Sequence, residues 1–491
     1  MTKAGSRELI LDILFEILER GGYSHVVLRQ ALEKYQYLEK QERAFITRVA
    51  EGTLEYRLTI DLVLDECSGV PVRKMKPMIR TLLRMSVYQL LWMDRVPDSA
   101  VCNEAVKLAA ARHFQGLKGY VNGVLRRIAR EKERFVPAEE AGEQPDSGQE
   151  RFLPGDWSYR YSMPAWLIEL WKGQYPAFQV ENMLKAFLAQ RPVTVRCNPG
   201  LAVVEEITES LESQQVRVTS CPLGKGMLFL ENLDYLEKLD AFRRGWIQVQ
   251  DASSGLVGLA ADPRPGDVVL DVCGAPGGKG LHMAELLGGT GLVVIRDISE
   301  AKIRLVRENL ERAGRTEEAR PGVQGGQPGE ARPGVHGRQP GAAPAYGNVR
   351  TEVWDAREPD PAWYGKADIV IADLPCSGLG VIGRKPEIKY QASPEQIRDL
   401  AALQRQILTV ASQYVKPGGK LVYSTCTISP EENERQRQWI LASLPFSGVS
   451  IRGLLGEGVE EETLQEGYVQ LLPGTYPCDG FFIAVFQRTD Q

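Results

Sequence analysis

Apolar residues recur with the spacing of an α-helix along residues 1–130 of the chain. The repeats cover the stretches Leu9–Leu18, Val26–Leu32, Phe45–Leu54, Leu82–Leu91 and Val101–Ala110. No part of this region alternates apolar and polar residues as a half-buried strand does. The pattern therefore predicts an all-α helical bundle over residues 1–131.

From residue 243 onward, short apolar strands alternate with helices. The predicted strands are Val268–Val272, Leu292–Ile295, Ile369–Ala372, Leu421–Tyr423 and Phe482–Val485, and the predicted helices are Gly278–Leu287, Glu300–Ala313, Pro394–Tyr414 and Glu431–Leu441. This alternation is typical of a Rossmann-like α/β domain with a doubly wound, mostly parallel sheet. Such sheets bind ligands at the carboxyl ends of their strands, so residues that directly follow strands are the first candidates for a site.

The regions outside these two parts follow other patterns. Residues 132–154 are polar, contain Pro137 and Pro145, and predict a linker. Residues 155–242 mix helical and strand-like stretches and predict a small α+β, RNA-binding domain, whose aromatic residues could stack on bases or pack in its own core. A Gly/Pro/Arg-rich segment, Glu318–Gly329, is repeated almost verbatim as Glu330–Gly341, which predicts a disordered insertion over about 315–347.

Composition and charge narrow the class of protein. The 43% apolar and 25% charged residues are typical of a globular protein, and no apolar run reaches the roughly 18 residues of a membrane span. Acidic residues interrupt the apolar positions near the N-terminus, so no signal peptide is predicted and we expect the protein to be cytoplasmic. We also expect it to be a monomer. Residues 1–130 contain 21 Lys and Arg against 15 Asp and Glu. This excess favours contact with RNA phosphates, and a solvated surface would explain it as well.

The eight cysteines and four histidines predict neither disulfides nor a metal site. No Cys-x-x-Cys pair occurs, and no histidine lies at ligand spacing from a cysteine. We therefore expect free thiols and no metal cofactor.

A glycine-containing loop follows the first predicted strand of the α/β domain. It consists of Cys273, Gly274, Ala275, Pro276, Gly277, Gly278 and Lys279, and a helix starts within it. Backbone N–H groups of such a loop can approach a nucleotide-like ligand closely. Asp297 ends the next strand, where a carboxylate can hold ribose hydroxyls, and Asp355 is placed to reach an adenine edge. Together they favour an adenosine-bearing cofactor.

Two cysteines lie just beyond predicted strands, Cys376 in the sequence DLPCSG and Cys426 in YSTCT. A thiol beside an adenosine cofactor suits methylation of cytosine, because C5 of the ring accepts a methyl group only after a thiolate has added at C6. A protonated carboxyl such as Asp373 can hydrogen-bond the N3/N4 edge of the base during this addition. These residues alone do not decide which cysteine attacks.

The motifs resemble those of a known family. Residues 155–491 carry, in family order, the blocks CGAPGGK, RDIS, DLPCSG, STC and DGFF of the RNA cytosine-C5 methyltransferases. The N-terminal segments ERAF, LLRM, NEAV and VNGVLRR resemble the NusB-like RNA-binding domain. This combination resembles the subtype of the family that acts on small-subunit ribosomal RNA.

The resemblance implies a class I methyltransferase domain that uses S-adenosylmethionine. By the same resemblance Cys426 is the nucleophile, Cys376 assists product release, and Asp373 contacts both base and cofactor. Lys279 then lies against the target base, and the cofactor pocket consists of Cys273–Lys279, Asp297, Asp355 and Asp373. The implied target is cytosine 967 of 16S ribosomal RNA, methylated before the subunit is fully assembled.

Two other functions remain open at this point. One is methylation of transfer RNA, which site-resolved mapping of 5-methylcytosine would distinguish. The other is a non-catalytic RNA-binding factor for ribosome assembly, which would not need to bind S-adenosylmethionine.

Overall fold

The computed structural model describes residues 5–35, 37–135, 156–314, 346–456 and 458–489. It divides into a helical unit, Met1–Ala189 with Ile382–Gln391, and a second unit, Gln190–Val381 with Ala392–Gln491, which we call the catalytic unit because it contains the predicted catalytic residues. The tandem repeat and almost all of the predicted linker lie outside the described residues. The domain boundaries at residues 131, 154 and 242 stay predictions.

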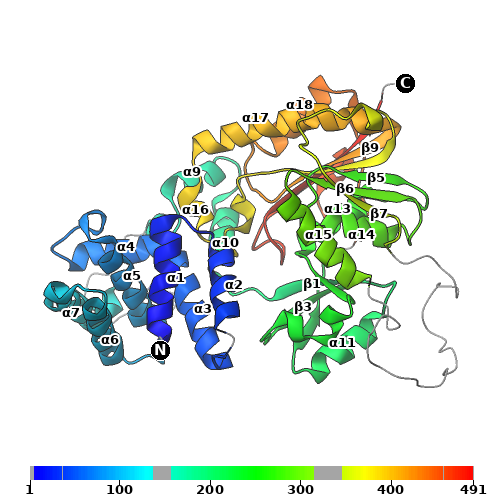
Figure 1. Ribbon diagram of the computed structural model, residues 1–491. Coiled ribbons are helices and arrows are strands. Elements are labelled where there is room, and N and C mark those ends of the chain that lie inside the picture. Colours follow the sequence, from blue (N-terminus) through cyan, green and yellow to red (C-terminus); the bar gives the residue numbers. More distant parts are fainter. Residues whose placement is uncertain (1–4, 36, 136–155, 315–345, 457, 490–491) are drawn as a thin grey trace, which may run out of the picture. The chain divides into compact units, whose positions relative to one another are not determined.

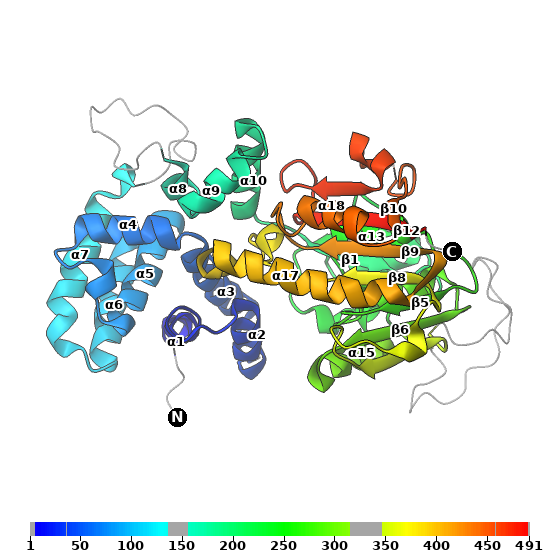
Figure 2. The ribbon, with the colours of Figure 1, turned by 90° about the horizontal axis from the view of Figure 1, so that it is seen from above.

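The helical unit is built around α5 (Pro77–Trp92), whose residues are buried along nearly its whole length. A helix that is apolar on every side has to be surrounded by others. The helices packed against it are α1 (Ser6–Arg20), α3 (Lys40–Glu55), α4 (Arg57–Cys67), α6 (Asp98–Ala111) and α7 (Lys118–Arg130), and α2 (Ser24–Lys34) packs on α1 and α3 (Figures 1 and 2). The unit also contains α8 (Trp157–Arg160), α9 (Ala165–Lys172), α10 (Ala177–Leu188) and the short α16 (Ile388–Gln391). The predicted all-α bundle is confirmed.

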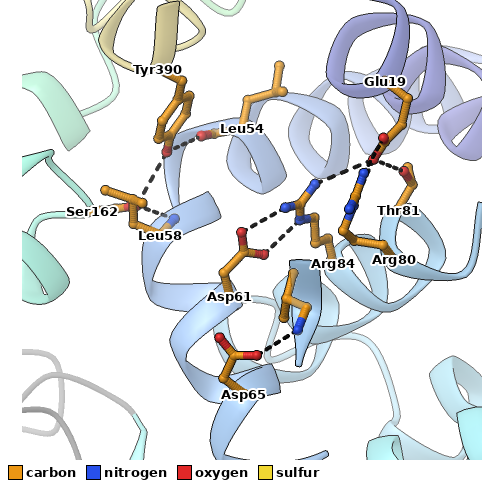
Figure 3. Close-up of polar contacts among 11 residues, drawn as sticks. Glu19, Leu54, Leu58, Asp61, Asp65, Arg80, Thr81, Arg84, Ser162 and Tyr390 are labelled. Atoms are coloured by element: carbon orange, nitrogen blue, oxygen red, sulfur yellow. Dashed lines mark hydrogen bonds and ion pairs between the residues drawn. The ribbon is translucent and has the colours of Figure 1, made fainter. Parts of the chain in front are cut away.

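Charged side chains inside this unit are paired. Arg84 donates two hydrogen bonds to Asp61, each of 2.7 Å, and Arg80 Nε donates to Glu19 at 3.0 Å (Figure 3). A guanidinium that is taken out of water needs such a two-pronged acceptor, because an unpaired buried charge is costly. These pairs connect α5 to α4 and α1.

The segment Ile382–Gln391 contacts the ends of two helices of the helical unit. The Glu387 carboxylate accepts hydrogen bonds from the backbone N–H and the hydroxyl of Ser24, at 3.0 and 2.8 Å, in the first turn of α2. Lys389 Nζ donates to the Glu55 carbonyl at 2.7 Å, and the Tyr390 hydroxyl donates to the Leu54 carbonyl at 2.9 Å (Figure 3). The ends of helices expose N–H and C=O groups that have no partner within the helix. The segment provides partners for the Ser24 N–H and for the Leu54 and Glu55 carbonyls.

The buried ammonium of Lys389 makes the stability of the helical unit depend on pH. Burial lowers the pKa of Lys389 to about 7, with the neighbouring Arg57 acting in the same direction and Glu55 opposing. Between pH 7 and the ordinary lysine pKa of about 10.4, the unfolded chain therefore binds the extra proton. The free energy of unfolding should rise across this window by up to about 1.4 kcal/mol per pH unit from this group.

Substituting Lys389→Met removes this contribution. We expect the free energy of unfolding of the unmodified protein to rise relative to that of Lys389→Met as the pH rises from 7 to 10, measured by urea unfolding at several pH values. Lys385→Met, in the same segment, is the control and should show no such trend. A stability difference for Lys389→Met that stays constant over this range would contradict the assignment.

The catalytic unit contains a small antiparallel sheet and a large mixed sheet. The small sheet has the order β2-β3-β1-β4 and is packed against α11 (Val204–Ser213) and α12 (Asp240–Arg243). Its strands are β1 (Val193–Cys197), β2 (Arg217–Ser220), β3 (Met227–Glu231) and β4 (Ile247–Val249). This arrangement of helices and strands confirms the predicted α+β fold.

The large sheet has the order β10-β12-β9-β8-β5-β6-β7, and β11 pairs with β12. Its strands are β5 (Val268–Asp271), β6 (Leu292–Asp297), β7 (Val349–Val353), β8 (Ala367–Asp373), β9 (Val415–Thr425), β10 (Phe446–Gly448), β11 (Tyr468–Leu471) and β12 (Phe481–Arg488). Strands β9, β8, β5, β6 and β7 are parallel, and β12 runs antiparallel to β9.

Helices cover both faces of this sheet. Side chains such as Val269 and Ile371 pack with α13 (Ala252–Ala261), α14 (Gly278–Leu286) and α15 (Glu300–Ala313). Their neighbours along the same strands, such as Leu270 and Val370, lie in a second core with α17 (Pro394–Ala411) and α18 (Glu434–Ser443) (Figures 1 and 2). Because successive strand residues point to opposite faces, one apolar run supplies both cores. The predicted doubly wound α/β domain is confirmed.

Candidate active site

The polar residues of the candidate site gather where β5, β8 and β9 end, which we call the carboxyl edge of the sheet. Strands β8 and β9 are parallel neighbours, with Asp373 opposite Ser424 in the register. Cys376 follows β8 by three residues, and Cys426 directly follows β9. The pairing of these two strands therefore brings together cysteines that are 50 residues apart in the chain.

The two thiols are in contact. The Sγ atoms of Cys376 and Cys426 lie 3.3 Å apart, both cysteines are free, and both are partly exposed. The pKa of Cys376 is held well above its usual range, first by the hydrogen bond with Cys426, then by burial and by the charge of Glu432. Cys376 therefore holds its proton firmly and can donate it toward the Cys426 sulfur.

An ion pair lies beside the β8–β9 pairing at the carboxyl edge. Lys279 Nζ donates to Asp373 Oδ2 at 2.7 Å and to the Ser254 hydroxyl at 2.9 Å. The Ser424 hydroxyl donates to the other oxygen, Asp373 Oδ1, at 2.8 Å. Lys279 also lies 5.2 Å from the centre of the Phe481 ring. Sequence reasoning found Lys279 and Asp373, whereas Ser254 carried no motif signal of its own.

The glycine loop connects β5 to α14 and leaves no room for larger side chains. A Cβ atom on Gly274 would lie 2.5 Å from Ile295 Cγ2 and 2.7 Å from Asp271 Cγ. Gly277 adopts a φ of +104°, which favours glycine. The backbone N–H of Ala275 donates to Asp297 Oδ2 at 3.2 Å. The Gly274 N–H donates to the Arg296 carbonyl at 2.8 Å, so the loop is held directly beside the end of β6, where Asp297 lies.

The two predicted cofactor acids differ in their surroundings. Asp297 is buried, accepts a hydrogen bond from the Ile298 N–H at 2.8 Å, and has Lys302 Nζ within 3.1 Å. Asp355 lies beyond the end of β7 and is paired with Arg357, whose hydrogen bonds lower the pKa of this carboxyl. The structure thus brings Asp297 to the glycine loop, while a ligand would have to share Asp355 with Arg357.

One acidic residue of the site was missed by sequence reasoning. Asp271 is fully buried at the end of β5, and its Cγ lies within 2.7 Å of where a Gly274 Cβ would stand. Burial, aided by the charge of Asp373, raises the pKa of Asp271 to about 7. Its signal in the sequence was an acid at the end of an otherwise apolar strand, which is rare without a functional or structural partner.

The described part of the chain contains no group of three or more His, Cys, Asp or Glu side chains that could hold a metal ion. None of the helices in the described ranges is long and apolar enough to cross a membrane.

Comparisons with known proteins match all three parts of the chain. Residues 4–130 match the NusB family, and residues 163–233 match the "Methyltr_RsmF/B-like, ferredoxin-like domain". Residues 259–321 and 346–487 match the family described as "16S rRNA methyltransferase RsmB/F".

Full-length relatives show the same order of parts. The chain is 31% identical over 491 residues to "Probable ribosomal RNA small subunit methyltransferase B" of Bacillus subtilis, covering 99% of this chain and 100% of the relative. It is 29% identical to "Ribosomal RNA small subunit methyltransferase B" of Vibrio cholerae, with 98% and 97% covered. The crystal structure of PH0851 has the same fold, with a TM-score of 0.76, 24% identity and 99% of both chains covered.

The two contacting cysteines should differ in reactivity. Because only the thiolate is alkylated rapidly and the pKa of Cys376 is raised, we expect iodoacetamide at pH 8 to modify Cys426 at least about tenfold faster than Cys376. Peptide mapping by mass spectrometry over a time course measures both rates in the same sample. Equal rates, or faster modification of Cys376, would contradict this description of the pair.

Proposed function

The chain belongs to the RsmB/F family of 16S rRNA methyltransferases, and we propose that it transfers a methyl group from S-adenosylmethionine to C5 of a cytosine in small-subunit ribosomal RNA. The observation that supports this most directly is the pair of thiols 3.3 Å apart beside Asp373 and Lys279. One thiol to attack the ring and a second group to complete the reaction are what C5 methylation requires. Cytosine 967 remains the target implied by the family resemblance.

The carboxyl edge fits an adenosine-bearing methyl donor. Gly274 and Gly277 let the loop pack closely against Asp271, Ile295 and Val306, and the Asp297 carboxylate next to the loop is a suitable partner for ribose hydroxyls. Asp373 adds a carboxylate at the end of β8, which suits the positive charge of a sulfonium or an ammonium group. When bound, S-adenosylmethionine supplies an electrophilic methyl group.

Cys426 begins the reaction as the nucleophile. Its thiolate forms the S–C6 bond, and the electron pair of the C5–C6 double bond moves onto the N3/N4 edge and C5 of the ring. Asp373 and the Lys279 ammonium that donates to it are placed to hydrogen-bond this edge and to relieve its negative charge. C5 then has the electron density to take the methyl group.

Cys376 completes the reaction. The hydrogen bond with Cys426 is the largest cause of the raised pKa of Cys376. Once the Cys426 sulfur is bonded to C6, it is a neutral thioether and this cause is removed, so Cys376 ionises more readily. The Cys376 thiolate can then take the proton from C5, the C5–C6 double bond re-forms, and the C6–S bond breaks to release Cys426 as a thiolate.

A groove between α6 and α7 supports RNA as the partner of the helical unit. Its volume is about 500 Å³, and it is lined by Asn103, Lys107, Lys118, Asn122 and Arg126 among others. Lysine, arginine and amide side chains are the usual ligands of phosphate and sugar oxygens. Contacts of this kind increase affinity without reading sequence, so they would hold the RNA while the catalytic unit selects the base.

Substitution of the two cysteines tests the chemistry. Cys426→Ala should abolish methyl transfer, because no other group forms the S–C6 bond. Cys376→Ala should leave the addition intact but block release, so that a protein–RNA adduct survives denaturing electrophoresis. Cys67→Ala, in α4 of the helical unit, is the control and should methylate normally. Normal turnover by Cys426→Ala would disprove the assigned nucleophile.

Charge reversal tests the α6–α7 groove. The double variant Lys118→Glu/Arg126→Glu should bind ribosomal RNA more weakly, and the slope of log affinity against log salt should become shallower by about 1.4 to 1.8. The slope is measured by filter binding between 50 and 200 mM salt. Each tenfold change in affinity corresponds to about 1.4 kcal/mol of binding free energy. Arg398→Glu on α17, where Arg398 pairs with Glu395 in the catalytic unit, is the control. An unchanged slope in the double variant would exclude the groove as a phosphate contact.

A further inference from the structure

A buried carboxylate holds the loop that carries Cys376. Glu432 follows β9 by seven residues and is completely buried. Its Oε1 accepts a hydrogen bond from the Ser377 backbone N–H at 2.8 Å, and its Oε2 accepts one from the Ser377 hydroxyl at 2.5 Å. Both oxygens of one carboxylate are thus used by the residue next to Cys376, which restrains its backbone and its side chain together.

A glutamine of α17 holds the other side of the same loop. Gln404 Nε2 donates to the Pro375 carbonyl at 2.9 Å and to Glu432 Oε1 at 3.2 Å. The amide is oriented by the Tyr423 hydroxyl, which lies 3.1 Å from Gln404 Oε1 and 2.5 Å from the Glu432 carbonyl. The residues before and after Cys376 are therefore both bound to one buried network.

The same network reaches the nucleophile. The Ser377 hydroxyl donates to Glu432, so it accepts from the Thr427 hydroxyl, 2.7 Å away, and Thr427 is the residue after Cys426. The Gly380 N–H also donates to the Cys426 carbonyl at 3.0 Å. Glu432 is thus connected, through one serine, to the neighbours of both cysteines.

A residue that only filled this space would not need the hydrogen bonds that the Glu432 carboxylate accepts. Burying Glu432 carries a large desolvation cost, which is also why its pKa is raised. An apolar residue would fill the same space at less cost, but it could not fix the direction of the Ser377 N–H and hydroxyl. The position of the Cys376 sulfur relative to Cys426 depends on those directions.

We propose that Glu432 is a positioning residue for the second half of the reaction: acting through Ser377, it holds the Cys376 sulfur where it takes the proton from C5. This inference rests on the proposed function, and it adds a residue that does not contact the base. A displaced base slows proton removal strongly, because transfer requires the two atoms within hydrogen-bond reach. Addition by Cys426 and binding of the methyl donor should be affected much less.

The test separates adduct formation from adduct release. Glu432→Ala is mixed with S-adenosylmethionine and a ribosomal RNA fragment, and both the denaturation-resistant protein–RNA adduct and the methylated free RNA are followed over time. We expect adduct formation within about threefold of the unmodified protein and release slowed at least about tenfold, so that adduct accumulates as in Cys376→Ala. Glu432→Gln keeps an acceptor for the Ser377 N–H and should restore most of the release rate.

Two further variants complete the design. Glu431→Ala changes the preceding glutamate, which is partly exposed and pairs with Arg435, and should behave as the unmodified protein. Ser377→Ala leaves the buried carboxylate in place and removes the hydroxyl that connects it to Thr427, so it should also slow release, and it provides the test independently of the folding of Glu432→Ala.

The possible results are distinct. Normal release by both Glu432→Ala and Ser377→Ala would overturn the inference, as would an equal loss of formation and release, which indicates a general loss of structure. If the unmodified protein forms neither adduct nor methylated RNA while it still binds S-adenosylmethionine, the proposed function itself is wrong and the inference is overturned with it.

Discussion

The parallel pairing of β8 with β9 is the constraint on which the candidate active site depends. Because Asp373 lies opposite Ser424 in this register, the residues just beyond both strands meet, and the two sulfur atoms come within 3.3 Å. A shift of one residue would turn every side chain of β9 to the other face of the sheet. The buried residues that alternate between the two cores prevent such a shift, so the apolar interior of the sheet fixes the geometry of the thiols.

Two carboxyl groups at the carboxyl edge, Asp373 and Asp271, lie in different surroundings. Asp373 is matched by Lys279 and by the Ser424 hydroxyl, whereas Asp271 lies in the interior with its pKa raised to about 7. Two carboxyl groups in different surroundings can hold different protonation states at one pH. Near pH 7 Asp271 can therefore gain or lose a proton in the interior, within electrostatic reach of the Asp373–Lys279 ion pair.

Sequence reasoning predicted β5, β6, β8 and β9 of the parallel sheet and the residues directly after them, because an apolar run followed by a polar motif is a local signal. It did not give β7, whose residues Val349–Val353 include a charged arginine and glutamate and do not form an apolar run. It predicted Cys376, Cys426, Asp373 and Lys279 as one site, and the structure places these four side chains at one edge. It missed Gln404 and Glu432, whose partners lie 9 to 55 residues away in the chain. A glutamine in an amphipathic helix carries no sign of what it contacts, and only the packing of α17 on the sheet reveals it.

The segment Ile382–Gln391 leaves the catalytic half of the sequence between β8 and α17, yet Glu387, Lys389 and Tyr390 hydrogen-bond to Ser24, Glu55 and Leu54 of the N-terminal half. If the two halves were made as separate polypeptides, Glu387 and Lys389 would be exposed to water, and the Ser24 N–H and the Glu55 carbonyl would lose these partners. Separate production of the helical unit would therefore need these ten residues, which begin six positions after Cys376, to be supplied together with it.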